Sequence, residues 1–320
     1  MNKLSRFAVL ATGVLALSAC SGTGQDEPAA DEEVEDLTIA VVTHGAPDDS
    51  FWSVVKAGSD RSGEDLGINV EYNSDPDATA QSELIDQAVA DEVDGIVVSM
   101  ANPDGLRDSV EAAVEAGVPV ITINSGVDES AELGAITHIG QSEDIAGEAA
   151  GEQFNELGAT KLLCVIHEAG NIGLEQRCKG AANTFGGEVE TLQIEGAETA
   201  TASESISSAL QSDDSIDAVL ALNGQVALGS TQAVEELGTQ VQTGTFDLSS
   251  DVITAIQDGQ LSFAIDQQPY VQGYLGVQFL YLKAINGNDV GGGQPVYSGP
   301  ALVTEENADE VAEFADAGTR

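Results

Sequence analysis

Short apolar runs recur along the body of the chain, and within each run the apolar residues are nearly continuous rather than alternating with polar ones. Such runs are typical of parallel β-strands that are covered on both faces of their sheet. The pattern predicts seven strands, at Leu37–Val42, Val93–Val98, Val118–Ile123, Leu162–Ile166, Ile216–Leu222, Val241–Phe246 and Leu261–Ile265.

Stretches with helical periodicity separate these strands. The apolar residues of two such stretches fall on one helix face each, Leu84, Ile85, Ala88 and Val89 in the first and Leu106, Val110, Ala113 and Val114 in the second. Glycines stand where helices should end, at Gly117, Gly158 and Gly259. The regular alternation of strand and helix predicts an α/β fold with right-handed crossovers.

The alternation occurs twice, from Leu37 to about Gly140 and again from Lys161 to about Gln267. The segment 142–157 between the two series predicts a helix with Ile145, Ala149, Phe154 and Leu157 on its core side. A length of 320 residues also favours division into two lobes. We therefore expect two similar lobes, each built on a doubly wound sheet.

Ligands of doubly wound sheets bind beyond the carboxyl ends of the strands. Polar residues that closely follow predicted strands are therefore candidates for a binding site, namely Asp49, Asn102, Asn124, Asn223, Asp247 and Gln267. Because Asn102 precedes Pro103, it is equally a turn and helix-entry signal, and we leave it out of the predicted site.

The first nineteen residues have the features of a signal peptide. Lys3 and Arg6 precede an apolar stretch, Phe7–Leu17, that is too short to span a bilayer. The stretch ends in Leu-Ser-Ala-Cys, which resembles a bacterial lipobox, so we expect cleavage before Cys20 and a diacylglycerol on its thiol. The alternative is an ordinary signal peptide with a chance cysteine. Residues 20–36, rich in Gly, Ser and acidic residues, predict a flexible linker.

The charge is strongly negative. Ten Lys and Arg stand against 55 Asp and Glu, a net charge of −45, which becomes −47 when the signal peptide and its two cations are removed. Such a surface repels phosphate backbones and argues against nucleic-acid binding. The excess favours a protein that works in high salt, where screening removes the self-repulsion, over an ordinary acidic surface protein.

Two cysteines remain after Cys20. An exported chain meets an oxidising compartment, so we expect a Cys164–Cys178 disulfide, with a pair of unconnected buried thiols as the alternative. Such a bond would close a loop of about fifteen residues.

No enzymatic or metal-binding motif is evident. The sequence has no P-loop, no nucleophile elbow and no calcium loop, and its three histidines lack zinc-type spacing, so we expect no cofactor and no metal. The triple glycine at 291–293 predicts a loop. His44 and the His167-Glu168 pair follow strands and could transfer protons, although loop positions near a ligand or in solvent are the simpler interpretation.

The segments at the strand ends resemble those of the ribose-type periplasmic binding proteins, the type I solute-binding components of sugar ABC transporters. The resemblance covers about residues 37–304 and depends on the order of eight segments: Thr43–Trp52, Asn102-Pro103, Val118–Gly126, His138-Ile139-Gly140, Arg177-Cys178-Lys179-Gly180, Ala221-Leu222-Asn223-Gly224, Phe246-Asp247 and Gln267-Gln268-Pro269.

This resemblance implies two α/β lobes joined by three crossover segments, with the ligand held in the cleft between them. It places residues 37–140 and 268–294 in the N-terminal lobe and residues 141–267 and 295–320 in the C-terminal lobe. The family is mostly monomeric, so we expect a monomer.

The resemblance also implies ligand contacts from the first lobe. Phe51 and Trp52 match the family's aromatic pair; the alternative is that both rings only anchor a helix on the sheet. Asp49 matches a polar residue that contacts the ligand in the family, and it is equally suited to cap that helix. Asn124 stands where the family carries Asp, and Ser125 where many members carry Arg. This departure removes a charge pair and argues against a plain ribose or galactose specificity.

From the second lobe, the family pattern implies contacts by Arg177, Asn223, Asp247 and Gln267, although Gly224 replaces the Asp that usually follows Asn223. A surface ion pair is the alternative for Arg177. The disulfide would link the helix of Arg177 covalently to the preceding strand and so hold the Arg177 guanidinium in place before the ligand binds. Three further residues are candidates for lining the cleft without a family counterpart, namely His44, His167 and Asn171.

These features predict a lipid-anchored protein on the outer face of the cytoplasmic membrane that captures a monosaccharide or polyol and delivers it to an ABC transporter permease. A sensory receptor for a quorum signal or chemotaxis would share the fold and differ in its partner. An exported glycosidase would need two carboxylates flanking one bond, whereas Asp49 and Asp247 are predicted on different lobes. A transcription-factor effector domain is disfavoured by the export signal and the lack of a basic segment.

Overall fold

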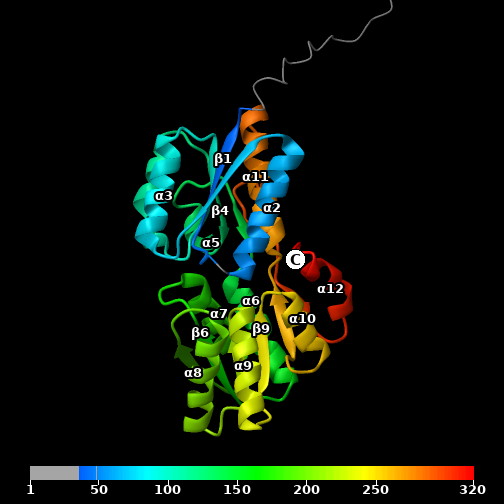
Figure 1. The fold of residues 1–320 in the computed structure, drawn as a ribbon. Coiled ribbons are helices and arrows are strands. Elements are labelled where there is room, and N and C mark those ends of the chain that lie inside the picture. The colour runs from blue at the N-terminus through cyan, green and yellow to red at the C-terminus, as the bar shows by residue number, and fades with distance from the viewer. Residues whose placement is uncertain (1–35, 48) are drawn as a thin grey trace, which may run out of the picture.

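The computed structural model describes residues 36–47 and 49–320, which form two α/β lobes stacked end to end (Figure 1). The predicted signal peptide, Cys20 and nearly all of the predicted linker lie outside the described residues. Among the residues described, no helix is both long enough and apolar enough to cross a bilayer.

Each lobe is built on a six-stranded sheet. The first sheet has the order β11-β5-β4-β3-β1-β2 and comprises β1 (Thr38–Thr43), β2 (Asn69–Ser74), β3 (Gly95–Ser99), β4 (Val120–Asn124), β5 (His138–Gly140) and β11 (Val296–Tyr297). The second has the order β12-β10-β9-β8-β6-β7 and comprises β6 (Lys161–Ile166), β7 (Glu188–Gln193), β8 (Ala218–Ala221), β9 (Gln242–Phe246), β10 (Phe263–Asp266) and β12 (Ala301–Val303). The strands pair in parallel, except that β12 is antiparallel to β10.

Helices cover both faces of each sheet. The first lobe contains α2 (Ser50–Leu66), α3 (Ala78–Ala90), α4 (Pro103–Glu115), the short α5 (Val127–Ser130) and α11 (Pro269–Asn286). The second contains α6 (Glu143–Glu156), α7 (Ile172–Thr184), α8 (Thr199–Ser212), α9 (Gly224–Leu237), α10 (Ser250–Gln257) and α12 (Ala308–Asp316). The predicted α/β class, with two doubly wound lobes, is confirmed.

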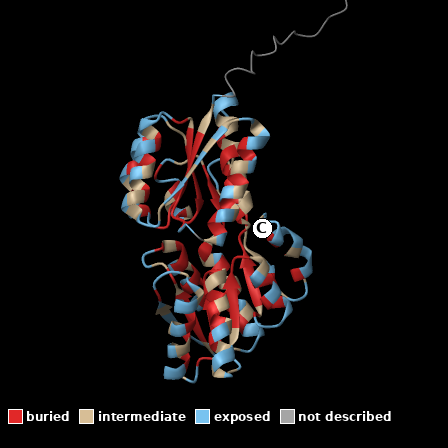
Figure 2. Cartoon of the chain, in the orientation of Figure 1, coloured by how far each residue is buried: buried red, intermediate tan, exposed pale blue. Residues whose placement is uncertain are grey.

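All seven predicted strands are present, with ends that agree to within about two residues. Successive side chains of β1 enter different apolar clusters: Ile39 and Val41 pack with α2 and α11, whereas Ala40 and Val42 pack with α3 and α4. Burial on both faces explains why these runs are continuous in the sequence. Figure 2 shows the buried residues concentrated on the strands and on the inward sides of the helices.

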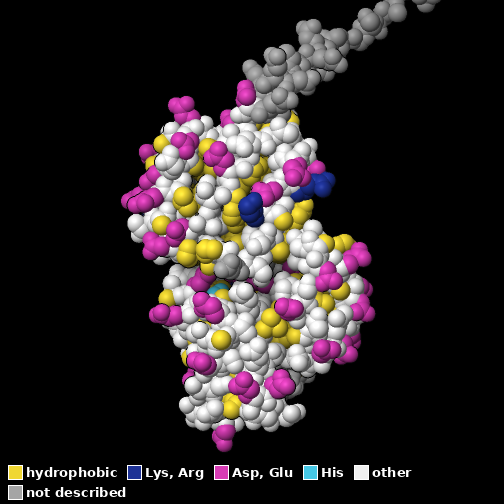
Figure 3. All heavy atoms as spheres, viewed as in Figure 1, with side chains coloured by type: hydrophobic (Ala, Val, Ile, Leu, Met, Phe, Trp, Pro, Cys, Tyr) yellow, Lys and Arg dark blue, Asp and Glu magenta, His cyan; other side chains and the backbone are white. Residues whose placement is uncertain are grey.

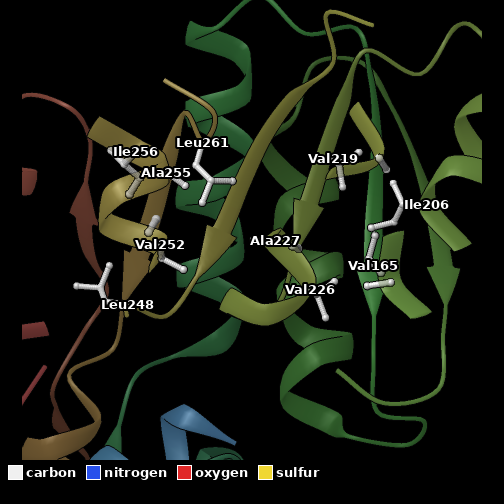
Figure 4. Packing of buried hydrophobic residues seen from close by; sticks show 14 of the residues in the cluster. Val165, Ile206, Val219, Val226, Ala227, Leu248, Val252, Ala255, Ile256 and Leu261 are labelled. Atoms are coloured by element: carbon white, nitrogen blue, oxygen red, sulfur yellow. The ribbon is translucent and has the colours of Figure 1, made fainter. Parts of the chain in front are cut away.

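The second lobe repeats this arrangement. One of its apolar clusters lies between the sheet and helices α8, α9, α10 and α12, and Figure 4 shows Val165 and Val219 of the strands with Ile206 and Val226 of the helices in this layer. A second cluster joins the other face of the sheet to α6 and α7.

The prediction for the core side of α6 is partly wrong. Phe154 is fully buried, but Ile145 is 53% exposed and Leu157 is 38% exposed. Helix α6 instead packs on α7 through its small residues, since a Cβ atom at Gly147 would collide with the carbonyl oxygen of Arg177. This close approach turns the large apolar side chains away from the interface.

The chain crosses between the lobes three times, after β5, after β10 and after β11. The predicted lobe boundary between residues 294 and 295 lies too early, because β11 pairs in parallel with β5 and so belongs to the first sheet. A strand of two residues at a sheet edge has no apolar run that could indicate it in the sequence.

Acidic side chains are spread over the visible face of both lobes, with few basic ones among them (Figure 3). This distribution agrees with the net charge of −45.

The predicted disulfide is present and joins Cys164 of β6 to Cys178 of α7, with a Cα–Cα distance of 5.8 Å. Both residues are buried in the cluster between the sheet and helices α6 and α7. The bond therefore fastens the helix that carries Arg177 directly to β6, the strand beside the edge strand β7 of the second sheet.

Replacing both cysteines, in the variant Cys164→Ala/Cys178→Ala, is expected to lower the free energy of unfolding by about 3 kcal/mol, because the unfolded chain regains the freedom of a fifteen-residue loop. Urea unfolding of the variant and the wild type measures the difference. Peptide mapping with and without reductant provides the control, and two free thiols in the unreduced wild type would contradict the bond.

Candidate functional site

The carboxyl ends of both sheets face the gap between the lobes. Each sheet has the strand order of a doubly wound fold that reverses direction beside its first strand, between β1 and β3 in the first lobe and between β6 and β8 in the second. Ligands of such folds bind at this reversal point. The two reversal points here lie opposite one another and enclose one cleft between the lobes.

All twelve predicted site residues line this cleft: His44, Asp49, Phe51, Trp52, Asn124, Ser125, His167, Asn171, Arg177, Asn223, Asp247 and Gln267. Glu168, Leu174 and Leu222 complete the lining. The space between the atoms of the cleft is about 340 Å³, including the part open to solvent. A narrow cleft with so many polar groups suits a small hydroxylated ligand.

Arg177 is buried, 3% exposed, and not on the surface. Its Nε and Nη2 donate to the two carboxylate oxygens of Glu143 at 2.6 and 3.0 Å, and its Nη1 donates to the carbonyl oxygen of Leu222 at 3.2 Å. Its guanidinium carbon lies 4.4 Å from the ring centre of Phe246. These contacts fix the guanidinium in one orientation at the cleft wall.

A chain of amide and carboxylate side chains links the two lobes across the cleft floor. Asn124 of the first lobe donates to Gln267 Oε1 at 3.0 Å, and Gln267 Nε2 donates to Asp247 of the second lobe at 2.7 Å. Gln272 of α11 also donates to Gln267 Oε1, at 3.1 Å. Gln267 therefore connects the second crossover to ligand-facing groups on both lobes.

Asn124 and Asp247 adopt left-handed backbone conformations, with φ of 64° and 69°. Asn and Asp tolerate this region better than other residues with a side chain, because their short polar groups bond locally. Both stand at the last residue of a strand or directly after one, at β4 and β9. The strained turn directs their side chains into the cleft.

Burial changes the protonation of the cleft carboxylates. Loss of water raises the pKa of Asp247 to about 7, although the charge of Arg177 and the hydrogen bond from Gln267 act in the opposite direction. Burial likewise raises the pKa of Asp49 to about 6. Ionisation of either group is costly unless a donor reaches it, and ligand hydroxyls are suitable donors.

Asp49, Phe51 and Trp52 each serve the fold as well as the cleft. Asp49 caps α2 by accepting from the backbone N–H of Phe51 at 2.8 Å. Phe51 and Trp52 contact each other edge to face, with ring centres 4.9 Å apart, and both belong to the apolar cluster under α2. The helix-anchoring role is therefore present, and both rings also line the cleft, where the predicted ligand contact would be made.

The two lobes touch at the rim of the cleft. The backbone N–H of Ile172, in the first turn of α7, donates to the carbonyl oxygen of Ala101 in the first lobe at 2.9 Å. Gln176 of α7 donates to Asp128 of the first lobe at 3.2 Å. These contacts mark a closed arrangement of the lobes.

Sequence reasoning missed two groups that matter to this geometry. Glu143, the partner of Arg177, occupies the first turn of α6, where an acidic residue is expected for helix capping alone. Glu168 follows β6 and was considered for proton transfer but not for the binding site. Neither position carries a sequence signal of burial, because the partners of Glu143 lie on a different helix, α7, and Glu168 lies in a loop after a strand.

The fold and this cleft define a two-lobed solute-binding protein. The sequence profile described as "Periplasmic binding protein domain" matches residues 39–289. The chain therefore belongs to the periplasmic binding protein family, and the type I resemblance is confirmed.

Three related proteins place the chain within this family. A carbohydrate transporter of Acidothermus cellulolyticus 11B, solved in complex with myo-inositol, is 40% identical with a TM-score of 0.87, over 89% of this chain and 100% of the other. The fructose import binding protein of Bifidobacterium longum is 26% identical over 84% of this chain and 86% of its own length. The xylitol-binding protein of Mycolicibacterium smegmatis is 26% identical over 98% of this chain and 89% of its own length.

Glu143→Gln is expected to weaken ligand binding at least about tenfold, because a neutral amide can no longer hold both Nε and Nη2 of Arg177. The free energy of unfolding should also fall by about 3 kcal/mol, since a buried charge loses its partner. Calorimetric titration and urea unfolding measure the two effects. Glu152→Gln, at an exposed position of the same helix, is the matched control. Unchanged affinity in a destabilised Glu143→Gln protein would show that Arg177 needs no such support.

Asp247→Asn is expected to stabilise the ligand-free protein in a pH-dependent way. The raised pKa of about 7 means that the folded wild type gains stability from protonation of Asp247 at low pH and loses it as the pH rises through 7. The variant should therefore match the wild type near pH 4 and exceed it by up to about 4 kcal/mol above pH 7. Urea unfolding across this pH range measures the difference, with the exposed Asp251→Asn as control. A difference that does not vary with pH would contradict the assignment.

Proposed function

We propose that the protein captures a monosaccharide or polyol in the cleft between its lobes and presents it to the permease of an ABC transporter, without chemical change of the ligand. The observation that carries this proposal is the lining of the cleft, in which eleven of fifteen side chains are polar and the aromatic rings of Phe51 and Trp52 stand among them.

The chemistry of a hydroxylated ring fits this lining. Planar carboxylate, amide and guanidinium groups bond neighbouring hydroxyls in pairs, and each charge-assisted bond contributes roughly 1.5–3 kcal/mol. The apolar C–H faces of such a ring pack on aromatic side chains, which supply a large contact area. Arg177, Asp247 and Asn223 provide the polar part, and Trp52 provides the apolar face.

The contacts between the lobes support a mechanism in which the two lobes close around the ligand. The contacts of Ile172 with Ala101 and of Gln176 with Asp128 form only when the lobes approach. Gly173 lies at the same boundary, where a Cβ atom would be 2.8 Å from Ser125 Oγ. A ligand that bonds groups on both lobes favours this closed arrangement. A permease that recognises the closed arrangement would therefore distinguish the ligand-bound protein from the ligand-free protein by its shape.

Relatives narrow the ligand class. The relative at 40% identity was solved with myo-inositol, and another relative is described as xylitol-binding. Polyols without a charged group are therefore the first ligands to examine for this chain.

Attachment to the membrane is the second part of the proposal. The lipobox-like sequence ending at Cys20, followed by the acidic linker, supports a lipid anchor on the outer face of the cytoplasmic membrane, from which the monomeric domain would reach a permease.

Trp52 is the sole tryptophan of the chain and lines the cleft, so its emission reports on binding. Titration of the protein in high salt with pentoses, hexoses, inositols and linear polyols is expected to give a saturable shift at micromolar concentration for one class. The indole changes its surroundings when a ligand ring replaces water. Calorimetry with the same panel is the control for ligands that bind without an optical signal.

A flat response in both measurements, from protein shown to be folded by circular dichroism, would contradict the proposal. It would favour the sensory interpretation with a ligand of another class.

A further inference from the structure

The first strands of the two lobes end opposite each other, and the residues after them form one polar wall of the cleft. His44 follows β1, and His167 and Glu168 follow β6. The two sides are close enough for the charge of Glu168 to raise the pKa of His44, against the larger lowering by burial. We call His44, His167 and Glu168 the histidine wall.

The ring of His44 is held in one orientation. Ser99 Oγ accepts from the backbone N–H of His44 at 3.0 Å and lies 2.7 Å from Nδ1 of the same residue. The ring also packs edge to face on Trp52, with centres 4.6 Å apart. Ser99 therefore occupies Nδ1, and Nε2 is the ring nitrogen of His44 that is left for other contacts.

Glu168 brings an acceptor, and His167 brings a ring nitrogen. Asn171, which caps α7, donates to Glu168 Oε2 at 2.5 Å and so holds the carboxylate at the wall. His167 is 6% exposed, and its Nδ1 has no hydrogen-bond partner among the described residues. Buried polar atoms are normally hydrogen-bonded, so we expect a ligand group to bond this nitrogen at the cleft wall.

The other charged side chains of the cleft determine which ligand groups the histidine wall can accept. Arg177 is paired with Glu143, and among the described residues no Lys or Arg forms an ion pair with the three other cleft carboxylates, Asp49, Glu168 and Asp247. A carboxylate accepts hydrogen bonds and cannot donate when ionised. Ligand groups that can donate therefore match each of these carboxylates in its ionised form.

Building on the proposed function, we propose that the histidine wall selects cyclic polyols over aldopyranoses, with Glu168 as the deciding residue. A cyclitol carries a hydroxyl on every ring carbon and presents a donor to each carboxylate. An aldopyranose has a ring oxygen that only accepts, and an acceptor facing another acceptor leaves both unsatisfied. Glu168 thus excludes orientations that an aldopyranose needs when its other hydroxyls engage Asp49 and Asp247.

Glu168→Gln tests this directly, because an amide of the same shape can donate to a ring oxygen. Calorimetric titrations of the full chain with myo-inositol and with D-glucose are made on the wild type, on Glu168→Gln and on Glu175→Gln, an exposed position of α7 with the same charge change. We expect the wild type to prefer myo-inositol at least about tenfold. Glu168→Gln should lose about tenfold to a hundredfold in affinity for myo-inositol but not for D-glucose, and Glu175→Gln should behave as wild type.

His167→Asn, made in parallel, should shift the preference in the same direction by a smaller factor, and it serves if Glu168→Gln does not fold. Equal effects on both ligands, or a wild type that prefers D-glucose, would overturn the inference and leave the proposed function standing. A wild type that binds neither these ligands nor any other sugar or polyol would overturn both.

Discussion

Parallel pairing within each sheet is the constraint on which the rest of this molecule depends. Because neighbouring strands of a parallel sheet end at the same edge, the parallel strands of each sheet deliver their following residues to one place. Two such edges face each other here, and the cleft residues either follow a strand or occupy the first turns of the next helix. The site is thus a consequence of topology, and its chemistry is decided by short loops that the apolar cores leave free to vary.

How far the sequence predicts this structure depends on burial. Strands such as β1 and β3 are covered on both faces and are recognisable as continuous apolar runs, whereas the edge strands β2 and β7 carry mostly exposed polar residues and were not predicted. The cleft residues were predictable because they follow the recognisable strands and match family positions. Their partners were not, since Glu143 of α6 meets Arg177 of α7 only through the packing of these two helices, 34 residues apart in sequence. The face of α6 was misjudged because small residues, which carry little hydrophobic signal, make its contact with α7.

The cleft differs from the cores in that its polar groups are incompletely paired within the protein. Asp247 and Asp49 have raised pKa values because burial disfavours their ionised forms, and His167 Nδ1 has no partner among the described residues. Such groups cost free energy that a matching ligand returns when it binds. A ligand that satisfies groups on both lobes also stabilises the contacts between them, so binding and closure are a single equilibrium.

Two arginines of this acidic chain pair with buried carboxylates of the second lobe. Arg177 pairs with the buried Glu143 near the first crossover, and Arg320 donates to the fully buried Asp266 near the second, at 2.7 Å. Exposed carboxylates repel one another, but mobile ions screen that repulsion. Buried carboxylates are shielded from those ions and need a fixed cation. Each of the two arginines therefore stabilises a carboxylate of the second lobe next to a point where the chain crosses between the lobes.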